Sequence, residues 1–93
     1  MPYRIKSYSY SQAKKLGVTI KPSRVKGKKI DVFSKDGDKL ASIGALGMGD
    51  YPTFKLTKGR DFAEKRRKAY KSRHEKDRHK RGTAGYYADK ILW

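Results

Sequence analysis

The sequence predicts a small α+β domain with a β-hairpin or small antiparallel sheet, a long basic helix, and short N- and C-terminal helices. Two segments indicate this class. Around residues 28–44, Ile30 and Val32 alternate with more polar residues ahead of a Lys-Asp-Gly-Asp turn, as in a β-hairpin. Residues 61–78 place their few apolar side chains near one stripe of a helix. A chain of 93 residues has room for one such domain with a single modest core.

We divide the single domain, residues 1–93, into three parts. Residues 1–27 form an N-terminal arm with a short helix, and residues 28–56 form the hairpin and a glycine-rich connection. Residues 57–93 form the basic helix and an aromatic C-terminal cap. We expect partners to hold part of the arm in place.

The short helix of the arm is predicted at about residues 10–16. Ser9 or Ser11 has a hydroxyl that would accept a backbone N–H bond at the helix start. Gly17 is a natural stop because glycine adopts the left-handed conformation without strain. The segment that follows is expected to be extended, since Pro22 disfavours helical angles in the residue before it.

The hairpin is predicted to pair residues 28–34 with residues 39–44 across a turn at 35–38. Aspartate and glycine at the turn favour tight reversal of the chain. Leucine and isoleucine in the second segment supply its apolar side chains. The hairpin is therefore the clearest local prediction in the sequence.

Three closely spaced glycines, Gly44, Gly47 and Gly49, follow the hairpin. Glycines let a backbone approach a phosphate closely, but the segment matches neither a Walker A loop nor a dinucleotide-binding loop. We favour a tight connection in which glycine relieves backbone strain over a phosphate-binding nest. The side chains expected to pack over this connection are Tyr51, Pro52 and Phe54.

The basic helix is predicted over residues 61–78. Asp61 and Glu64 have the spacing of a capping box, and both acids would favour the positive end of the helix dipole. Its narrow apolar stripe consists of Phe62, Ala69 and Tyr70. Between residues 60 and 81, eleven basic residues stand against four acidic ones.

Net charge dominates the composition. The chain carries 25 Lys and Arg against 9 Asp and Glu, a formal charge of +16. The excess is spread along the chain, with 13 basic and 4 acidic residues in 1–58, and 12 basic and 5 acidic in 59–93. Such a charge opposes compaction unless a polyanion or an acidic protein surface neutralises it, so the composition implies a partner.

Cysteine and long apolar runs are absent from the sequence. Without cysteine there is no disulfide framework and no thiolate metal site. The N-terminus lacks the apolar run of a signal peptide, and no segment approaches the roughly 20 apolar residues of a membrane span. We therefore expect no membrane insertion.

His74, Glu75 and His79 resemble the zinc-protease motif H-E-x-x-H, but the second histidine comes one residue late. At about 100° per residue, the two histidines would lie about 140° apart around a helix and could not share one ion. No catalytic triad or second carboxylate pair accompanies them. We expect solvated or anion-contacting histidines, no metal, no cofactor, no small-molecule substrate and no enzymatic activity.

Basic residues interleaved with aromatic ones are the remaining pattern that bears on function. The predicted polyanion- or partner-binding residues are Lys28, Lys29, Arg60, Lys65, Arg66, Arg67, Lys68, Lys71, Arg73, His74, Lys76, Arg78, Lys80 and Arg81. The predicted aromatic anchors are Tyr70, Tyr86, Tyr87 and Trp93. Lysine and arginine neutralise phosphates or carboxylates, while tyrosines stack on bases or pack in protein interfaces. The pattern thus suits nucleic acid and acidic proteins equally.

The last residues combine a helix start with a large apolar end. Thr83 would cap a short final helix. We favour an arrangement in which Trp93 folds back to close the core with Phe62, Ile30 and Val32. The alternative is that Trp93 docks into the pocket of a neighbouring protein.

Four segments resemble small basic proteins encoded by nucleocytoplasmic large DNA viruses of algae and protists. They are SYSQAKKLGVTIKPS, SIGALGMGDYPTF, RRKAYKSRH and TAGYYADKILW, and together they cover nearly the whole chain. The family motifs match Gly44, Ala45, Gly47, Asp50 and Tyr51, and then Arg66, Arg67, Tyr70, Arg73 and His74. The resemblance implies a viral origin and a non-enzymatic role, and it brings no catalytic residues with it.

From the resemblance and the charge we expect a virion structural protein of minor capsid or cement type. Its partners would be the major capsid protein or other virion proteins, and it would reside in the virion and, before assembly, in the infected host cell. The alternative is a DNA-binding or genome-packaging protein that contacts double-stranded DNA without sequence specificity. An enzyme is disfavoured because no catalytic cluster is evident.

Overall fold

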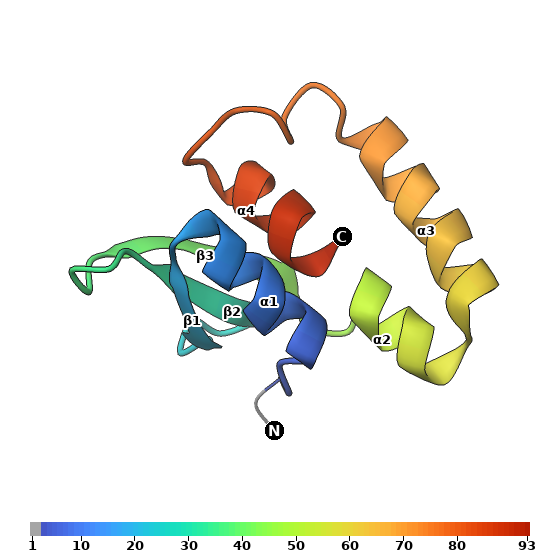
Figure 1. The fold of residues 1–93 in the computed structure, drawn as a ribbon, viewed down its shortest axis with the longest axis horizontal. Helices are drawn as coiled ribbons and strands as arrows, with labels where there is room; N and C mark the ends of the chain where they lie inside the picture. The colour runs from blue at the N-terminus through green and yellow to red at the C-terminus, as the bar shows by residue number, and fades with distance from the viewer. Residues whose placement is uncertain (1–2) are drawn as a thin grey trace.

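The computed structural model describes residues 3–93 and confirms the α+β class (Figure 1). Its helices are α1 (Ser7–Leu16), α2 (Tyr51–Thr57), α3 (Arg60–Arg73) and α4 (Ala84–Leu92). Its strands are β1 (Thr19–Pro22), β2 (Lys28–Phe33) and β3 (Lys39–Ala45). The predicted hairpin and the extended segment before it are therefore confirmed.

The three strands form one antiparallel sheet with β2 at its centre. On one side Ile20 pairs with Val32, and on the other Ile30 pairs with Ile43. These four side chains are buried, because helix α4 packs on β3 and helix α1 packs on α4 and β1. Helices α2 and α3 pack on each other beside this layer (Figure 1).

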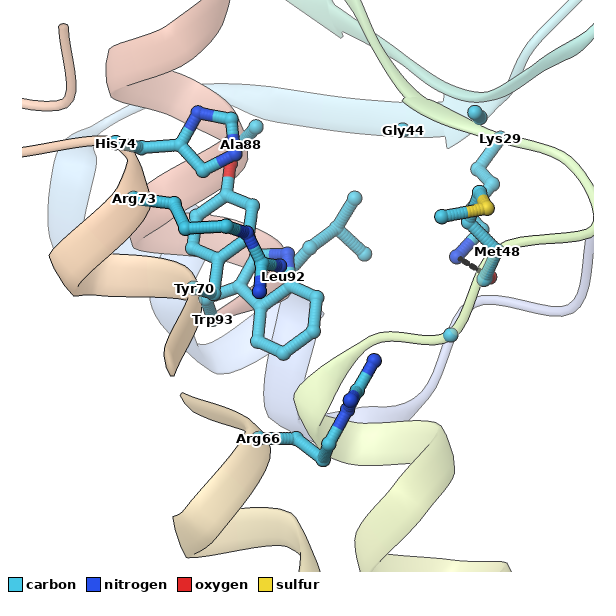
Figure 2. Close-up of a pocket in the computed structure, with 12 residues that line it drawn as sticks. Lys29, Gly44, Met48, Arg66, Tyr70, Arg73, His74, Ala88, Leu92 and Trp93 are labelled. Carbon is cyan, nitrogen blue, oxygen red and sulfur yellow. Dashed lines mark hydrogen bonds between the residues drawn. The ribbon is translucent and has the colours of Figure 1, made fainter. Parts of the chain in front are cut away.

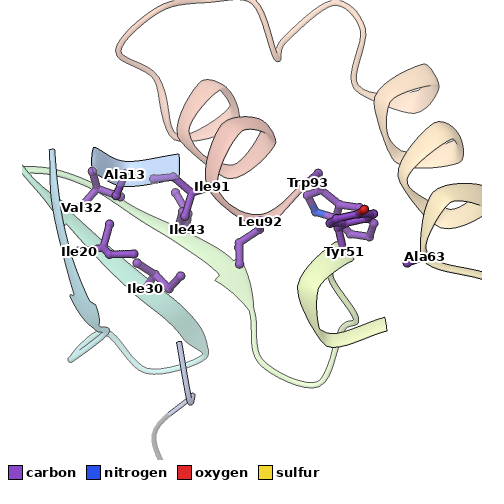
Figure 3. Close-up of a cluster of buried hydrophobic side chains, with 10 residues drawn as sticks. All are labelled: Ala13, Ile20, Ile30, Val32, Ile43, Tyr51, Ala63, Ile91, Leu92 and Trp93. Atoms are coloured by element: carbon purple, nitrogen blue, oxygen red, sulfur yellow. The ribbon is translucent and has the colours of Figure 1, made fainter. Parts of the chain in front are cut away.

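The core has an aliphatic part over the sheet and an aromatic part between α2, α3 and the chain end (Figure 3). The aliphatic part consists of Ala13, Ile20, Ile30, Val32, Ile43, Ile91 and Leu92. The aromatic part contains Tyr51 and Trp93, with Ala63 at its edge. The end of α4 joins the two parts.

Helix α1 begins earlier than the sequence predicted and is capped differently. It starts at Ser7 after Lys6, which makes no side-chain cap bond. Ser9 is buried within the helix, where its hydroxyl donates to the Ile91 carbonyl at 2.8 Å. Ser11 is exposed, so neither predicted cap acts as one. Gly17 ends the helix in the left-handed conformation, with φ 73°, as predicted.

Helix α2 lies within the segment that the sequence assigned to the glycine-rich connection. Asp50 caps it by accepting from the Thr53 backbone N–H at 2.9 Å, and Pro52 stands in its first turn. The connection itself is tight: a Cβ at Gly49 would lie 1.9 Å from the Phe54 ring. Phe54 therefore packs directly on glycine, as expected from the sequence.

Helix α3 ends at Arg73, before the predicted residue 78, and the predicted capping box does not form. The N-cap is Gly59 and has no side-chain cap bond; Glu64 instead accepts from the Tyr51 hydroxyl at 2.9 Å. The helix approaches the core through Ala63, Arg67 and Tyr70. Tyr70 lies on this face as predicted, whereas Ala63 takes the place of Phe62, which is 41% exposed.

The structure confirms that Thr83 caps the last helix and that Trp93 folds back into the core. Thr83 caps α4 by accepting from the Tyr86 N–H at 3.2 Å. Trp93 is only 8% exposed and belongs to the same core as Ile30 and Val32. Its ring stacks on Tyr70 rather than on the predicted Phe62. Trp93 is thus part of the fold and is not free to enter a neighbour's pocket.

Candidate polyanion-binding site

A cleft of about 230 Å³ opens between α3, the end of α4 and the loop after β3, and we call it the cationic cleft (Figure 2). Arg66, Arg73 and His74 stand along its α3 side. Leu92 lies between them and the opposite side, where Met48 stands. No aspartate or glutamate lines the cleft. Its walls therefore favour an anionic group with an apolar neighbour.

Arg66 and Arg73 are the exposed cations of this cleft. They are seven residues apart on one helix, so their Cα atoms are separated by about 10 Å along its axis at 1.5 Å per residue. Neither lies within ion-pair distance of a carboxylate in residues 3–93. The Arg66 guanidinium lies 5.6 Å from the Phe54 ring centroid, which leaves its N–H groups available to an anion.

Stacked aromatic rings form the α3 wall of the cleft. Tyr70 stacks on Trp93 with centroids 4.3 Å apart and on His74 with centroids 4.2 Å apart. Burial raises the pKa of the Tyr70 hydroxyl, and the nearby charge of Asp89 raises it further, so Tyr70 stays neutral. Because two rings already cover Tyr70, it offers no free face to a nucleic-acid base.

Lys29 also lines the cleft, but its ammonium is committed to the fold. Its side chain is buried, and Nζ donates to the Met48 carbonyl at 2.6 Å and to Asp50 Oδ2 at 2.7 Å. Burial alone would raise the pKa of Asp50, but hydrogen bonds from Lys29 and Thr53 outweigh it and hold that pKa below its ordinary value. The predicted role of Lys29 as a surface contact is therefore corrected: it is the buried partner of the α2 cap.

Arg67 is likewise a structural residue. Its guanidinium lies 3.7 Å from the centroid of the Tyr51 ring. Nε donates to the Trp93 carbonyl at 2.7 Å, and a terminal nitrogen donates to the Tyr8 hydroxyl at 3.0 Å. Arg67 thus ties α1, α2 and the chain end to α3, and few of its donors remain for a partner.

Lys71 and Arg78 surround the fully buried carboxylate of Asp89. Lys71 Nζ lies 2.8 Å from Asp89 Oδ1, and Arg78 lies 3.7 Å from Oδ2. Arg78 also donates twice to Glu75, at 2.7 and 3.0 Å. These cations hold α4 against α3 and the turns between them, so the prediction that they face a partner is corrected.

The other predicted cations lie on the surface. His74 is half-buried, and the exposed residues are Lys28, Arg60, Lys65, Arg66, Lys68, Arg73, Lys76, Lys80 and Arg81. Among the predicted aromatic anchors, Tyr70, Tyr86 and Tyr87 are half-buried, and the last two contact each other edge to face at 5.4 Å. The surface is therefore strongly cationic, whereas the aromatic rings serve mainly the interior.

Two exposed apolar side chains were not singled out from the sequence. Met48, at the rim of the cleft, is 68% exposed, and Leu56 on α2 is 73% exposed. Leu56 follows the buried Tyr51 and Pro52 on α2, whereas Met48 lies in a loop with the exposed Leu46, so no single local pattern marks the two side chains. Only the tertiary arrangement shows which apolar side chains stay exposed and which are buried.

The histidines do not form a metal site in the part of the chain that the structure describes. His74 follows the last residue of α3 and stacks on Tyr70, while His79 Nε2 lies 2.8 Å from Glu75 Oε1. No group of three or more metal-ligating His, Cys, Asp or Glu side chains gathers within residues 3–93. Among the same residues, no helix is both long enough and apolar enough to cross a bilayer.

Comparison with known proteins finds no relative. No protein-family model, no curated protein and no solved structure matches the chain. The resemblance of the four sequence segments to viral proteins therefore stays a prediction.

Proposed function

We propose that the chain is a non-enzymatic virion structural protein of a large DNA virus, of minor capsid or cement type. It binds acidic surfaces of the major capsid protein or of other virion proteins. The observation that carries this choice is the exposure of Met48, at 68%, at the rim of a cleft whose exposed cations are Arg66 and Arg73. Methionine and arginine are enriched in protein interfaces, and buried apolar anchors dominate their energetics.

The cationic cleft suits a carboxylate-bearing partner. An acidic side chain that enters it would meet Arg66 and Arg73, while its neighbours would cover Met48. Hydrogen bonds between arginine and carboxylate are charge-assisted and roughly twice as strong as neutral ones. A DNA phosphate would engage the same arginines, but interfaces with DNA are more polar and would leave Met48 without an apolar contact.

A second candidate, nonspecific binding of double-stranded DNA for genome packaging, has its own support. Exposed cations extend from Lys65 and Lys68 on α3 to Lys80 and Arg81 beyond it. If six such side chains met phosphates, affinity would fall with salt at a log-log slope of roughly −5. This attraction would provide adhesion without base specificity.

Fractionation of purified virus particles tests the proposal. Particles are opened, the DNA is digested with nuclease, and the shells are washed at about 0.5 M salt, where charges are screened beyond a few ångströms. We expect the chain to remain with the shell. Release with the digested genome would favour DNA packaging, and absence from both fractions would contradict a virion role.

Matched variants separate the two partners. Arg66→Gln with Arg73→Gln removes two charges from the cleft, and Lys65→Gln with Lys68→Gln removes two from elsewhere on α3. We expect the arginine pair and Met48→Gln each to reduce shell retention more than the lysine pair does. If the arginine and lysine double variants lose shell retention equally and Met48→Gln has no effect, the result would support DNA as the partner.

A further inference from the structure

A second groove, of about 580 Å³, lies on another side of α2 and is lined by residues 4–8, Pro52, Lys55 and Leu56. We call it the N-terminal groove. It shares no lining residue with the cationic cleft. Tyr51 and Phe54 of α2 face the aromatic core, so α2 stands between the two sites.

The groove has one wall from the N-terminal segment and one from α2, and contacts at both ends of the segment fix their spacing. At one end, the Tyr3 hydroxyl donates to Asp50 Oδ2, next to α2, at 2.8 Å. At the other end, Tyr8 accepts from Arg67 at 3.0 Å and packs on the Tyr51 ring with centroids 5.2 Å apart. The groove is thus formed before a ligand arrives, which lowers the ordering cost of binding.

The charged side chains of the groove are all cationic: Arg4, Lys6 and Lys55. None lies within ion-pair distance of a carboxylate in the region described by the structure. Partial burial lowers the pKa of the Lys6 ammonium; Asp50 opposes this effect, but Lys29 and Arg4 add to it. A ligand carboxylate would offset the part of this effect that comes from Lys29 and Arg4.

The same groove also has apolar walls. Leu56 is 73% exposed, Pro52 is buried at the base of α2, and Ile5 is half-buried. An apolar side chain laid between them would remove Leu56 from water, at about 25 cal/mol for each Å² covered. Phosphate groups would gain nothing from this surface, whereas an amphipathic acidic peptide would use both its charge and its apolar part.

We infer that the N-terminal groove binds an acidic segment of another protein that places at least one large apolar side chain against Leu56. A second copy of the chain is a poor occupant because it carries the same charge of +16. The inference does not depend on what occupies the cationic cleft. If acidic proteins fill both sites, the domain links two partners across α2.

Fluorescence anisotropy with paired synthetic peptides tests this inference. One peptide combines aspartates and glutamates with two leucines, and its counterpart carries serines in place of the leucines, so the charge is equal. At about 0.15 M salt, we expect the leucine peptide to bind about tenfold more tightly, the equivalent of about 1.4 kcal/mol. Equal binding of the two peptides would overturn the inference.

Variants locate the leucine preference. With Leu56→Ser, the affinities of the leucine and serine peptides should differ by no more than about twofold, because the apolar contact is lost. Leu46→Ser is the matched control, since Leu46 is also exposed, at 44%, but lies outside the groove. Lys55→Gln should weaken both peptides alike. A preference that survives Leu56→Ser, or disappears with Leu46→Ser, would place the binding elsewhere.

Two further measurements keep the test decisive. NMR shifts on addition of the leucine peptide should concentrate at residues 4–8 and 52–56, a result that does not depend on the stability of any variant. Anionic phosphatidylserine vesicles and a DNA duplex serve as competitors. Leucine-dependent shifts centred on another surface, or vesicle binding that needs Leu56 while peptide binding does not, would overturn the inference.

Discussion

Replacement of Asp50 by asparagine tests the buried polar cluster at the start of α2. Asparagine is as good a helix cap as aspartate, so the bond from the Thr53 N–H is retained. The substitution removes the negative charge that lies 2.7 Å from Lys29 Nζ. Lys29 is 3% exposed and would keep only the Met48 carbonyl as a partner. The variant therefore leaves a buried charge uncompensated, and it also removes the carboxylate oxygen that accepts from the Tyr3 hydroxyl.

Loss of one member of a buried ion pair costs about 3–5 kcal/mol. At about 0.05–0.15 kcal/mol per residue, a domain of 93 residues has a free energy of unfolding of about 5–14 kcal/mol. Each kcal/mol corresponds to about 4–8 °C in Tm for a domain of this size, so Asp50→Asn should lower Tm by at least about 12 °C. Trp93 is the only tryptophan and is buried, so its fluorescence in urea reports global unfolding.

The double variant Lys29→Met with Asp50→Asn is the control. It removes both charges, and we expect it to be more stable than Asp50→Asn alone, with a coupling free energy of about 2 kcal/mol or more between the sites. Asp50→Asn within about 1 kcal/mol of the wild type would refute the reasoning. The reasoning would also be refuted if the double variant lost as much stability as Lys29→Met alone and Asp50→Asn alone lose together.

The pH dependence gives an independent check. The pKa of Asp50 is lowered in the folded state, so the unfolded chain takes up its proton first as the pH falls. The stabilisation by this carboxylate is therefore full above its unfolded pKa of about 3.9 and is lost as the pH falls through the folded value. The stability gap between wild type and Asp50→Asn should narrow below about pH 4. A gap that stays constant would contradict the charge argument.

Two matched pairs test packing by the same urea assay. Ser9→Ala should lower the free energy of unfolding by about 1–3 kcal/mol, because Ser9 is buried and its hydroxyl donates to a buried carbonyl. Ser11 is exposed, so Ser11→Ala should change that free energy by less than about 0.5 kcal/mol. Equal effects of the two substitutions would contradict this arrangement. Gly49→Ala should cost about 1–3 kcal/mol, since its Cβ would lie 1.9 Å from the Phe54 ring. Gly85→Ala, whose Cβ would meet nothing closer than 3.5 Å, should be neutral or stabilising by up to about 1 kcal/mol.

The elements that the sequence predicted well have local causes. The Asp-Gly turn fixes the hairpin, Gly17 ends α1, and Thr83 begins α4, each through its own backbone preference or hydrogen bond. Helix α2 had a comparable signal, with Asp50 as the cap and Pro52 in the first turn. The neighbouring glycines favour a loop and outweigh that signal in the sequence.

The candidate site was less predictable because charge alone does not tell where a side chain points. Lys29 and Arg67 have the same local character as the exposed cations around them. Only the partners brought by distant segments, Asp50 and the Trp93 carbonyl, make them structural. The same holds for Lys71, which donates a hydrogen bond to Asp89, eighteen residues further along the chain.

The Arg-Arg-x-x-Tyr-x-x-Arg-His segment shows how one motif serves both the fold and the surface. Arg67 and Tyr70 point inward, to Tyr51 and Trp93 respectively. Arg66 and Arg73, next to this face of α3, project into the cationic cleft instead. The aromatic rings that resemble interface anchors in the sequence are therefore used mainly to hold the basic helix in place. The fold of this domain, with its charge of +16, thereby sets the positions of Arg66 and Arg73 along α3 before a partner arrives.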